Sequence, residues 1–110
     1  VGPTDVEERQ ADRREFALIQ NYPTPFNPPT SITYTSPTQA DVHLRIFNML
    51  GQEVATLVDA PQPGGSYTVN WEAQTNTGSR IASGVYFYRL EAKSADGRII
   101  NDMKRMVLLK

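Results

Sequence analysis

The chain of 110 residues has no cysteine and only one histidine, His43. Without cysteine it cannot form a disulfide, a thiolate metal site or a thiol nucleophile, and it suits a reducing or an oxidising compartment equally well. With one histidine it cannot build a multi-histidine metal cluster. His43 lies in the middle of a strand pattern, and no G-x-S-x-G elbow exists to accompany it. We therefore expect His43 to be a solvent-facing strand residue without a catalytic role.

The sequence also lacks long apolar runs and an excess of charge. No run approaches the roughly 20 apolar residues that a membrane helix needs. The formal net charge is −1, which gives no electrostatic reason to expect binding to nucleic acid or to an anionic membrane surface. The acidic residues are scattered, without EF-hand spacing, and no glycine loop of the phosphate-binding kind is present. We expect no enzyme activity, no metal and no cofactor.

Residues 1–15 differ in composition from the rest of the chain. Five acidic and three basic residues fall between Asp5 and Glu15, with almost nothing apolar among them. This pattern is typical of a solvated linker. The chain starts at Val1 without an initiator methionine or a signal-like apolar stretch, so we expect a piece of a longer polypeptide. The expected organisation is a charged linker over residues 1–15 and one domain over residues 16–110.

From Phe16 onward, apolar and polar residues alternate with period two, and turn residues separate the runs. Asn76–Gly78 and Asp96-Gly97 are expected turns, the Asp-Gly pair being a strong hairpin signal, and Pro61–Gly65 is expected to break a strand. No segment shows a helical period, which excludes a parallel α/β fold. The sequence predicts an all-β antiparallel sandwich of about seven strands, over residues 16–20, 31–36, 41–50, 53–58, 67–72, 85–92 and from 99 onward.

The aromatic residues favour core packing over ligand binding. Tyr67 and Trp71 share one strand face with an aliphatic residue, as do Tyr86 and Tyr88 on a later strand. The alternative is that exposed aromatics stack on sugars. The opposite face of residues 85–92 is also partly apolar and could be an interaction surface, so the pattern leaves open which face of this strand points inward.

Half of the eight prolines lie between Gln20 and Thr30, a segment that we call the strap. Proline fixes φ near about −65° and steers the preceding residue away from helix, so we expect the strap to be stiff and extended. We expect Tyr22 and Phe26 to anchor it to the sandwich. Because prolines lack an N–H donor, we also expect them to keep the strap from extending a sheet at its edge.

The last ten residues form an apolar strand with a basic end. Met106 and Leu108 alternate with Val107 and Leu109, so both faces are apolar. A core on one side cannot explain both faces. We therefore expect one face to be covered by the strap or by a partner.

Five groups of residues together resemble a known family. They are Phe16-x-Leu18-x-Gln20-Asn21-Tyr22-Pro23-x-Pro25-Phe26-Asn27-Pro28-x-Thr30-x-Ile32-x-Tyr34, then Val42-x-Leu44-x-Ile46-Phe47-Asn48-x-Leu50-Gly51-Gln52-x-Val54, then Trp71, then Ser83-Gly84-x-Tyr86, and finally Lys104-x-Met106-x-Leu108-Leu109-Lys110. In order and spacing, residues 16–110 resemble the type A C-terminal sorting domain of the type IX secretion system. That family is Ig-like and is related to the Ig-like part of the flagellar hook-capping protein. One departure is Thr24, where the family often has asparagine.

The resemblance implies a non-catalytic module on a larger secreted protein. Such proteins reach the periplasm by a separate signal peptide and cross the outer membrane because a translocon recognises the folded terminal domain. A sortase-like cysteine peptidase then commonly removes the domain at the surface. The implied partners are the outer-membrane translocon, the peptidase and a fused upstream cargo domain; the module itself is expected to be a monomer, secreted or at the cell surface, and to be cleaved within residues 1–15.

The resemblance also implies roles for particular residues. The terminal residues are expected to be recognised by the translocon: Lys104, Met106, Val107, Leu108, Leu109 and Lys110. The strap is expected to be structural support through its signature residues Gln20, Asn21, Tyr22, Pro23, Pro25, Phe26, Asn27 and Pro28. Two alternatives stay open, a carbohydrate-binding module and a structural Ig-like module, either one accessory to an extracellular enzyme.

Overall fold

The computed structural model describes residues 16–110, and the predicted linker over residues 1–15 lies outside the described residues. The described part is all-β. Its seven strands are β1 (Ala17–Leu18), β2 (Thr30–Ser36), β3 (Ala40–Phe47), β4 (Glu53–Gln62), β5 (Gly65–Trp71), β6 (Gly84–Ser94) and β7 (Ile99–Leu108). These strands pair with one another antiparallel, in a three-stranded sheet of order β1-β2-β5 and a four-stranded sheet of order β4-β3-β6-β7. The predicted seven-stranded sandwich is confirmed.

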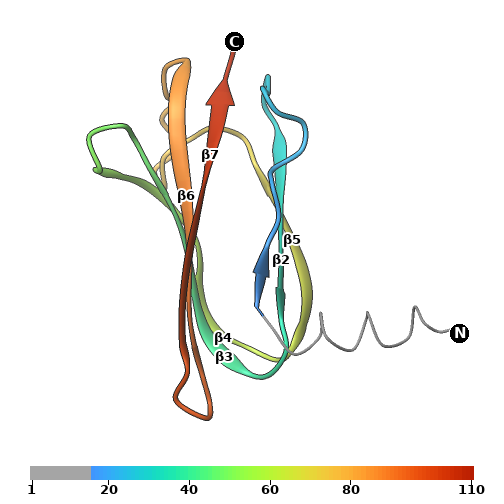
Figure 1. Cartoon of the computed structure of the whole chain (residues 1–110). Coiled ribbons are helices and arrows are strands. Elements are labelled where there is room, and N and C mark those ends of the chain that lie inside the picture. Colours follow the sequence, from blue (N-terminus) through green and yellow to red (C-terminus); the bar gives the residue numbers. More distant parts are fainter. Residues whose placement is uncertain (1–15) are drawn as a thin grey trace, which may run out of the picture.

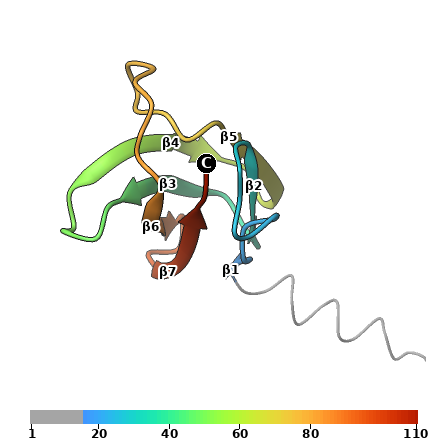
Figure 2. The ribbon, with the colours of Figure 1, turned by 90° about the horizontal axis from the view of Figure 1, so that it is seen from above.

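The two sheets face each other across one core, which Figures 1 and 2 show from the side and from above. The alternation in the sequence explains which side chains enter this core. In β3, Val42, Leu44 and Ile46 are fully buried while the residues between them point outward. Ile32 and Tyr34 of β2 approach from the opposite sheet and are equally buried. The sandwich is therefore stabilised mainly by removing these apolar faces from water.

The face of β6 that points into the core is the one that carries Tyr86 and Tyr88. Tyr86, Tyr88 and Leu90 are buried, so the predicted core role of the two tyrosines is confirmed. Trp71 at the end of β5 is buried as well, and Tyr67 packs at the edge of the core with its ring stacked on that of Tyr34, the centroids 5.3 Å apart. The partly apolar opposite face of β6 lies on the outside of the four-stranded sheet.

Several strand boundaries differ from the prediction. The first strand is only Ala17–Leu18, because the chain then leaves the sheet as the strap. The strand expected over residues 41–50 ends at Phe47, and a turn follows. The expected break over Pro61–Gly65 is shorter, since β4 continues to Gln62 with Pro61 in register opposite Asp41, and the break falls at Pro63 and Gly64. β4 is an edge strand, and edge strands are where sheets tolerate proline.

The predicted Asp-Gly hairpin between β6 and β7 is confirmed. The backbone N–H of Ser94 donates to the Arg98 carbonyl at 2.8 Å, and the N–H of Gly97 donates to the Ser94 carbonyl at 2.9 Å. Gly97 has a φ of 94°, which a side chain would strain. This hairpin returns the chain for the long pairing of β7 with β6.

Candidate functional site

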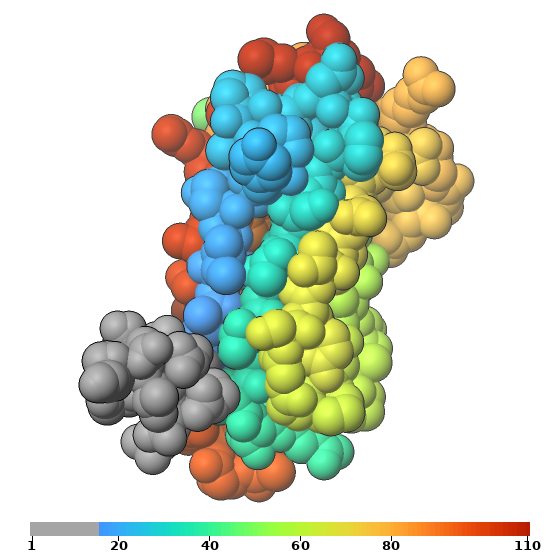
Figure 3. Space-filling view, turned by 90° about the vertical axis from the view of Figure 1, so that its right-hand side faces the viewer, coloured from blue at the N-terminus to red at the C-terminus, as the bar shows by residue number. Residues whose placement is uncertain are grey.

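The strap lies against the end of β7, so the two signature segments at opposite ends of the domain meet. The N–H of Phe26 donates to the Val107 carbonyl at 2.9 Å, and the N–H of Leu109 donates to the Phe26 carbonyl at 2.8 Å. These bonds form a parallel bridge between Phe26 and Leu108. Figure 3 shows the last residues beside the strap at one end of the molecule.

This bridge corrects the expectation that prolines keep the strap from extending a sheet. The strap pairs with β7 at Phe26, which keeps its N–H between Pro25 and Pro28, and with β2 at Tyr22, but each contact is an isolated bridge. Prolines on both sides have no donor, so the pairing cannot spread along the strap. The Gln20 side chain adds one further contact with the same edge, its Nε2 donating to the Arg105 carbonyl at 2.7 Å.

The two aromatic residues of the strap have different roles. Phe26 is buried with its ring centroid 6.2 Å from that of Trp71, which confirms its predicted role as an anchor. Tyr22 is 79% exposed, so its predicted role as an anchor is wrong. The backbone of Tyr22 explains the difference, because it pairs in both directions with Ser31 at 2.9 Å and its side chain then points to solvent.

Asn21 anchors the first part of the strap through buried hydrogen bonds. Its Nδ2 donates to Thr30 Oγ1 at 2.9 Å and to the Pro23 carbonyl at 3.1 Å. Its backbone N–H donates to the hydroxyl of Tyr88 at 2.8 Å, and that hydroxyl donates to the Ile19 carbonyl at 2.9 Å. Burial raises the pKa of Tyr88 from 10.0 to about 12, with the hydrogen bond from Asn21 acting against the rise. The neutral phenol thus links β6 to the strap.

The six predicted recognition residues differ in their exposure to solvent. Met106 and Leu108 are fully buried in the core, whereas Lys104 and Val107 are half-buried and Leu109 is 54% exposed. Lys110 is exposed, and its backbone N–H donates to Ser83 Oγ at 3.1 Å. The apolar face of Met106 and Leu108 is covered by the core itself. The strap covers the backbone edge of β7 and leaves Leu109 open to solvent.

A polar cleft of about 230 Å³ lies beside this junction. The strap contributes Asn27 and Pro28 to its wall, and the chain end contributes Lys110. The connection between β5 and β6 completes the wall with Glu72, Ala73, Gln74 and Arg80. The exposed chain end thus lies next to a surface that carries both signs of charge.

His43 is half-buried on the outer face of β3, with Nδ1 2.9 Å from Asp59 Oδ1. In residues 16–110, no three His, Cys, Asp or Glu side chains gather in a way that could hold a metal ion. In the same part of the chain, no helix is long and apolar enough to cross a membrane.

The sandwich is of the Ig-like class, and the comparison with family models assigns the family. Residues 27–96, more than half of the chain, match the model of the FlgD Ig-like domain. The chain belongs to the FlgD Ig-like domain family. A comparison with curated proteins found no match.

Solved structures share the fold at low sequence identity. PorU from Porphyromonas gingivalis, in its dimeric latent form, superposes with a TM-score of 0.69 at 17% identity, over 87% of this chain and 10% of that chain. PorZ, an essential bacterial surface component of the type IX secretion system of P. gingivalis, gives 0.51 at 21% identity, over 86% and 12%. FlgD from P. aeruginosa gives 0.59 at 14% identity, over 86% and 70%. The chain thus spans about a tenth of PorU and of PorZ.

These comparisons confirm the resemblance inferred from the signature residues at the level of family and fold. The family match agrees with the predicted relation to a flagellar Ig-like domain. Ig-like domains of this kind are a non-catalytic fold, and the fold also occurs in PorZ, a type IX secretion component.

Proposed function

We propose that this chain is the sorting module of a larger secreted protein, which it directs across the outer membrane through the type IX secretion system. The observation that carries this proposal is the bridge between Phe26 and Leu108. It joins the two most distant parts of the family signature into one structural unit and holds the chain end in a fixed place. The module itself has no catalytic role and is a monomer, and its destination is the cell surface or the medium.

Exposure assigns different tasks to the terminal residues. A translocon that recognises the folded domain can contact only accessible side chains, which are those of Lys104, Val107, Leu109 and Lys110. Met106 and Leu108 are fully buried and act through the fold. The strap supports this arrangement through Phe26, while the polar cleft lies next to Lys110 and widens the surface that a partner could contact.

Two exposed apolar residues, one at the start of β7 and one just after its end, provide a test variant and a matched control. Leu109 is 54% exposed beside the strap, and Ile99 is 72% exposed at the other end of β7. The 110-residue chain is fused behind a periplasmic reporter in a host with a working type IX system, as wild type, Leu109→Asp and Ile99→Asp. We expect wild type and Ile99→Asp to reach the medium and Leu109→Asp to stay in the periplasm. Protease resistance of each retained domain checks that it is folded.

Export of a folded Leu109→Asp variant at the wild-type level would contradict the recognition surface, and a wild-type fusion that stays periplasmic would contradict the sorting function. Removal of residues 109 and 110, which keeps the buried Leu108, separates this function from that of a structural spacer: loss of export by a folded domain supports sorting, whereas a spacer would lose only stability.

We also propose that a sortase-like cysteine peptidase removes the module by cutting within residues 1–15, upstream of β1. N-terminal sequencing of the released domain locates the cut, and a start after Phe16 would contradict this position.

The alternative of a carbohydrate-binding module finds less support. A row of exposed aromatic side chains would favour it, but Trp71, Tyr86 and Tyr88 are buried. Among the described residues, Tyr22 is the single large aromatic side chain that is mostly exposed. Retention of the 110-residue chain on insoluble polysaccharide would revive this alternative.

A further inference from the structure

The outer face of the four-stranded sheet carries an apolar pocket away from the chain end. The registers of β3, β6 and β7 align its residues in rows across the strands. One row holds Phe47, Phe87 and Arg105, and the next holds Arg45, Arg89 and Met103. Aromatic and cationic side chains therefore alternate over a small area of the sheet surface.

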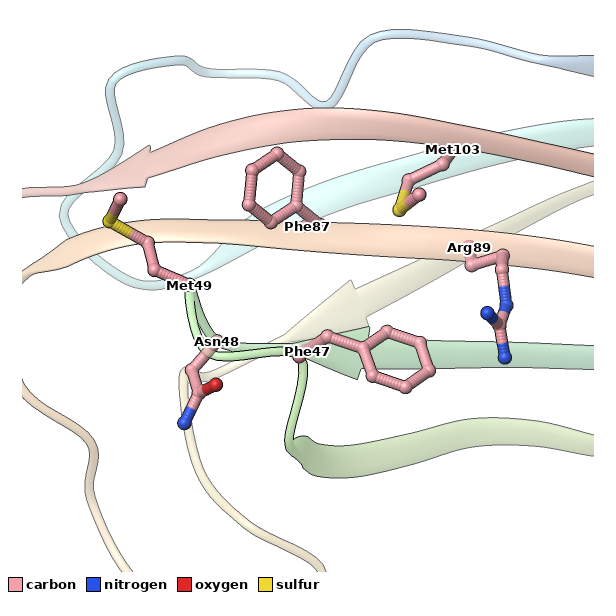
Figure 4. A pocket seen from close by; sticks show the side chains of 7 residues that line it. Phe47, Asn48, Met49, Phe87, Arg89 and Met103 are labelled. Carbon is pink, nitrogen blue, oxygen red and sulfur yellow. The ribbon is translucent and has the colours of Figure 1, made fainter.

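Phe47 and Phe87 of the first row, with Arg89 and Met103 of the second, line a pocket of about 260 Å³. Figure 4 shows Phe47, Phe87, Met49 and Met103 around it, with Arg89 at one end. Met49 is 70% exposed and Met103 is 52% exposed, so the pocket is open to solvent at its rim. Flexible methionine side chains of this kind adapt to differently shaped apolar partners.

Three arginines lie in this area, Arg45, Arg89 and Arg105, against two carboxylates, Glu53 and Glu91. Arg45 and Arg89 stand directly opposite each other, and Glu91 bridges them, with Oε1 2.7 Å from Arg45 Nη1 and Oε2 3.3 Å from Arg89 Nη2. Arg89 also lies over the ring of Phe47, its Cζ 4.6 Å from the centroid. The Nε of Arg89 is buried and has no acceptor among the described residues, but the side chain as a whole is 30% exposed. The outer part of its guanidinium is therefore open to a ligand.

We propose that this pocket binds a peptide segment of a partner protein in which an acidic residue stands next to an aromatic or aliphatic one. The apolar side chain enters between Phe47 and Phe87, and the carboxylate accepts a hydrogen bond from the exposed part of the Arg89 guanidinium, whose side chain is 30% exposed. A sugar is disfavoured because Arg89 already covers the Phe47 ring, which is the surface that a sugar would stack on. An extended anionic surface is disfavoured because Glu53 and Glu91 lie in the same area.

The methionines supply a direct readout of binding. The chain has three methionines, of which Met49 and Met103 line the pocket while Met106 is fully buried on the opposite face of the sheet. The 110-residue chain labelled at the methionine methyl groups is titrated with acetyl-Asp-Phe-amide and, separately, with acetyl-Asn-Phe-amide, followed by NMR. We expect saturable shifts of the Met49 and Met103 signals with Met106 unchanged, and about tenfold weaker binding of the Asn peptide.

Two variants test whether Arg89 is the cation that binds the peptide carboxylate. Arg89→Gln should reduce binding of the Asp peptide to the level of the Asn peptide, whereas Lys93→Gln, on the same outer face of β6, should leave binding unchanged. An unchanged Met106 signal shows that each variant is folded. Equal binding of the two peptides, the absence of shifts at millimolar peptide, or full binding by Arg89→Gln would each overturn the proposal. None of these outcomes bears on export, which is tested through Leu109.

Discussion

Phe26 and Leu108 lie side by side in parallel orientation although they come from opposite ends of the domain. Both hydrogen bonds of this bridge are formed by the backbone of Phe26, at 2.9 Å to Val107 and at 2.8 Å from Leu109. The ring of Phe26 is simultaneously in the core against Trp71. A change at Phe26 therefore affects the strap, the core and the chain end together.

Phe26→Ala should destabilise the domain by about 3–5 kcal/mol, because it leaves a cavity beside Trp71. Tyr22→Ala removes an aromatic residue from the same strap, but that side chain is 79% exposed, so we expect a change within about 0.5 kcal/mol. Urea unfolding of the two variants and the wild type measures both effects. Equal losses of stability would contradict the assignment of Phe26 as the anchor.

Asn21→Asp should lower the stability by at least about 2 kcal/mol at neutral pH, since a carboxylate cannot donate to Thr30 and Pro23 and is buried there. Burial favours the protonated acid, so the pKa of the new carboxyl is raised in the folded state. The stability of the variant should therefore recover as the pH falls toward 4. Asn27→Asp, at an exposed strap position, is the control and should show neither effect.

The buried phenol of Tyr88 predicts a loss of stability at alkaline pH. Its pKa is about 12 in the folded domain and 10.0 as a reference. Because the folded-state pKa is the higher one, the stabilisation is complete below pH 10 and is lost as the pH rises from 10 to 12. The loss amounts to at most roughly 2–3 kcal/mol.

Tyr88→Phe removes this titration and also two hydrogen bonds, with Asn21 and Ile19. The variant should be less stable than the wild type at pH 8, and the difference should shrink at about pH 11.5. Thermal unfolding of both proteins at the two pH values gives the comparison. A difference that stays constant with pH would contradict the role of the phenol.

Glu91→Gln should cost about 1 kcal/mol, because it leaves Arg45 and Arg89 facing each other without their shared carboxylate. The loss should be smaller in 1 M salt, which screens the repulsion. Arg45→Gln added to Glu91→Gln should recover most of the stability, and a double-mutant cycle measures the coupling. Additive effects of the two substitutions would show that the pair does not interact.

Much of the fold is predictable from the sequence because alternation has a local cause. Val42, Leu44 and Ile46 point inward since every second residue of a strand faces the same way. The prolines likewise predict that the strap is not helical. Local pattern does not decide between the two apolar faces of β6; the register with β3 does, placing Tyr88 opposite Ile46 and Leu90 opposite Leu44.

The site is less predictable because its contacts join distant residues. Tyr22 and Phe26 have similar surroundings in the sequence, with prolines nearby. Their backbone partners distinguish them, Ser31 for Tyr22 and the last strand for Phe26, and neither pairing can be read from local sequence. The pocket between Phe47 and Phe87 likewise arises from the register of β3 and β6. In the sequence, this pocket is indicated only by the partly apolar second face of residues 85–92.

The late position of β7 also sets the order in which the domain can form during synthesis. Phe26 has no backbone partner until Val107 and Leu109 have left the ribosome. A chain that stops before β7 would lack both backbone partners of Phe26, and the strap would not be held beside Trp71. The core therefore cannot be completed until the last strand is present.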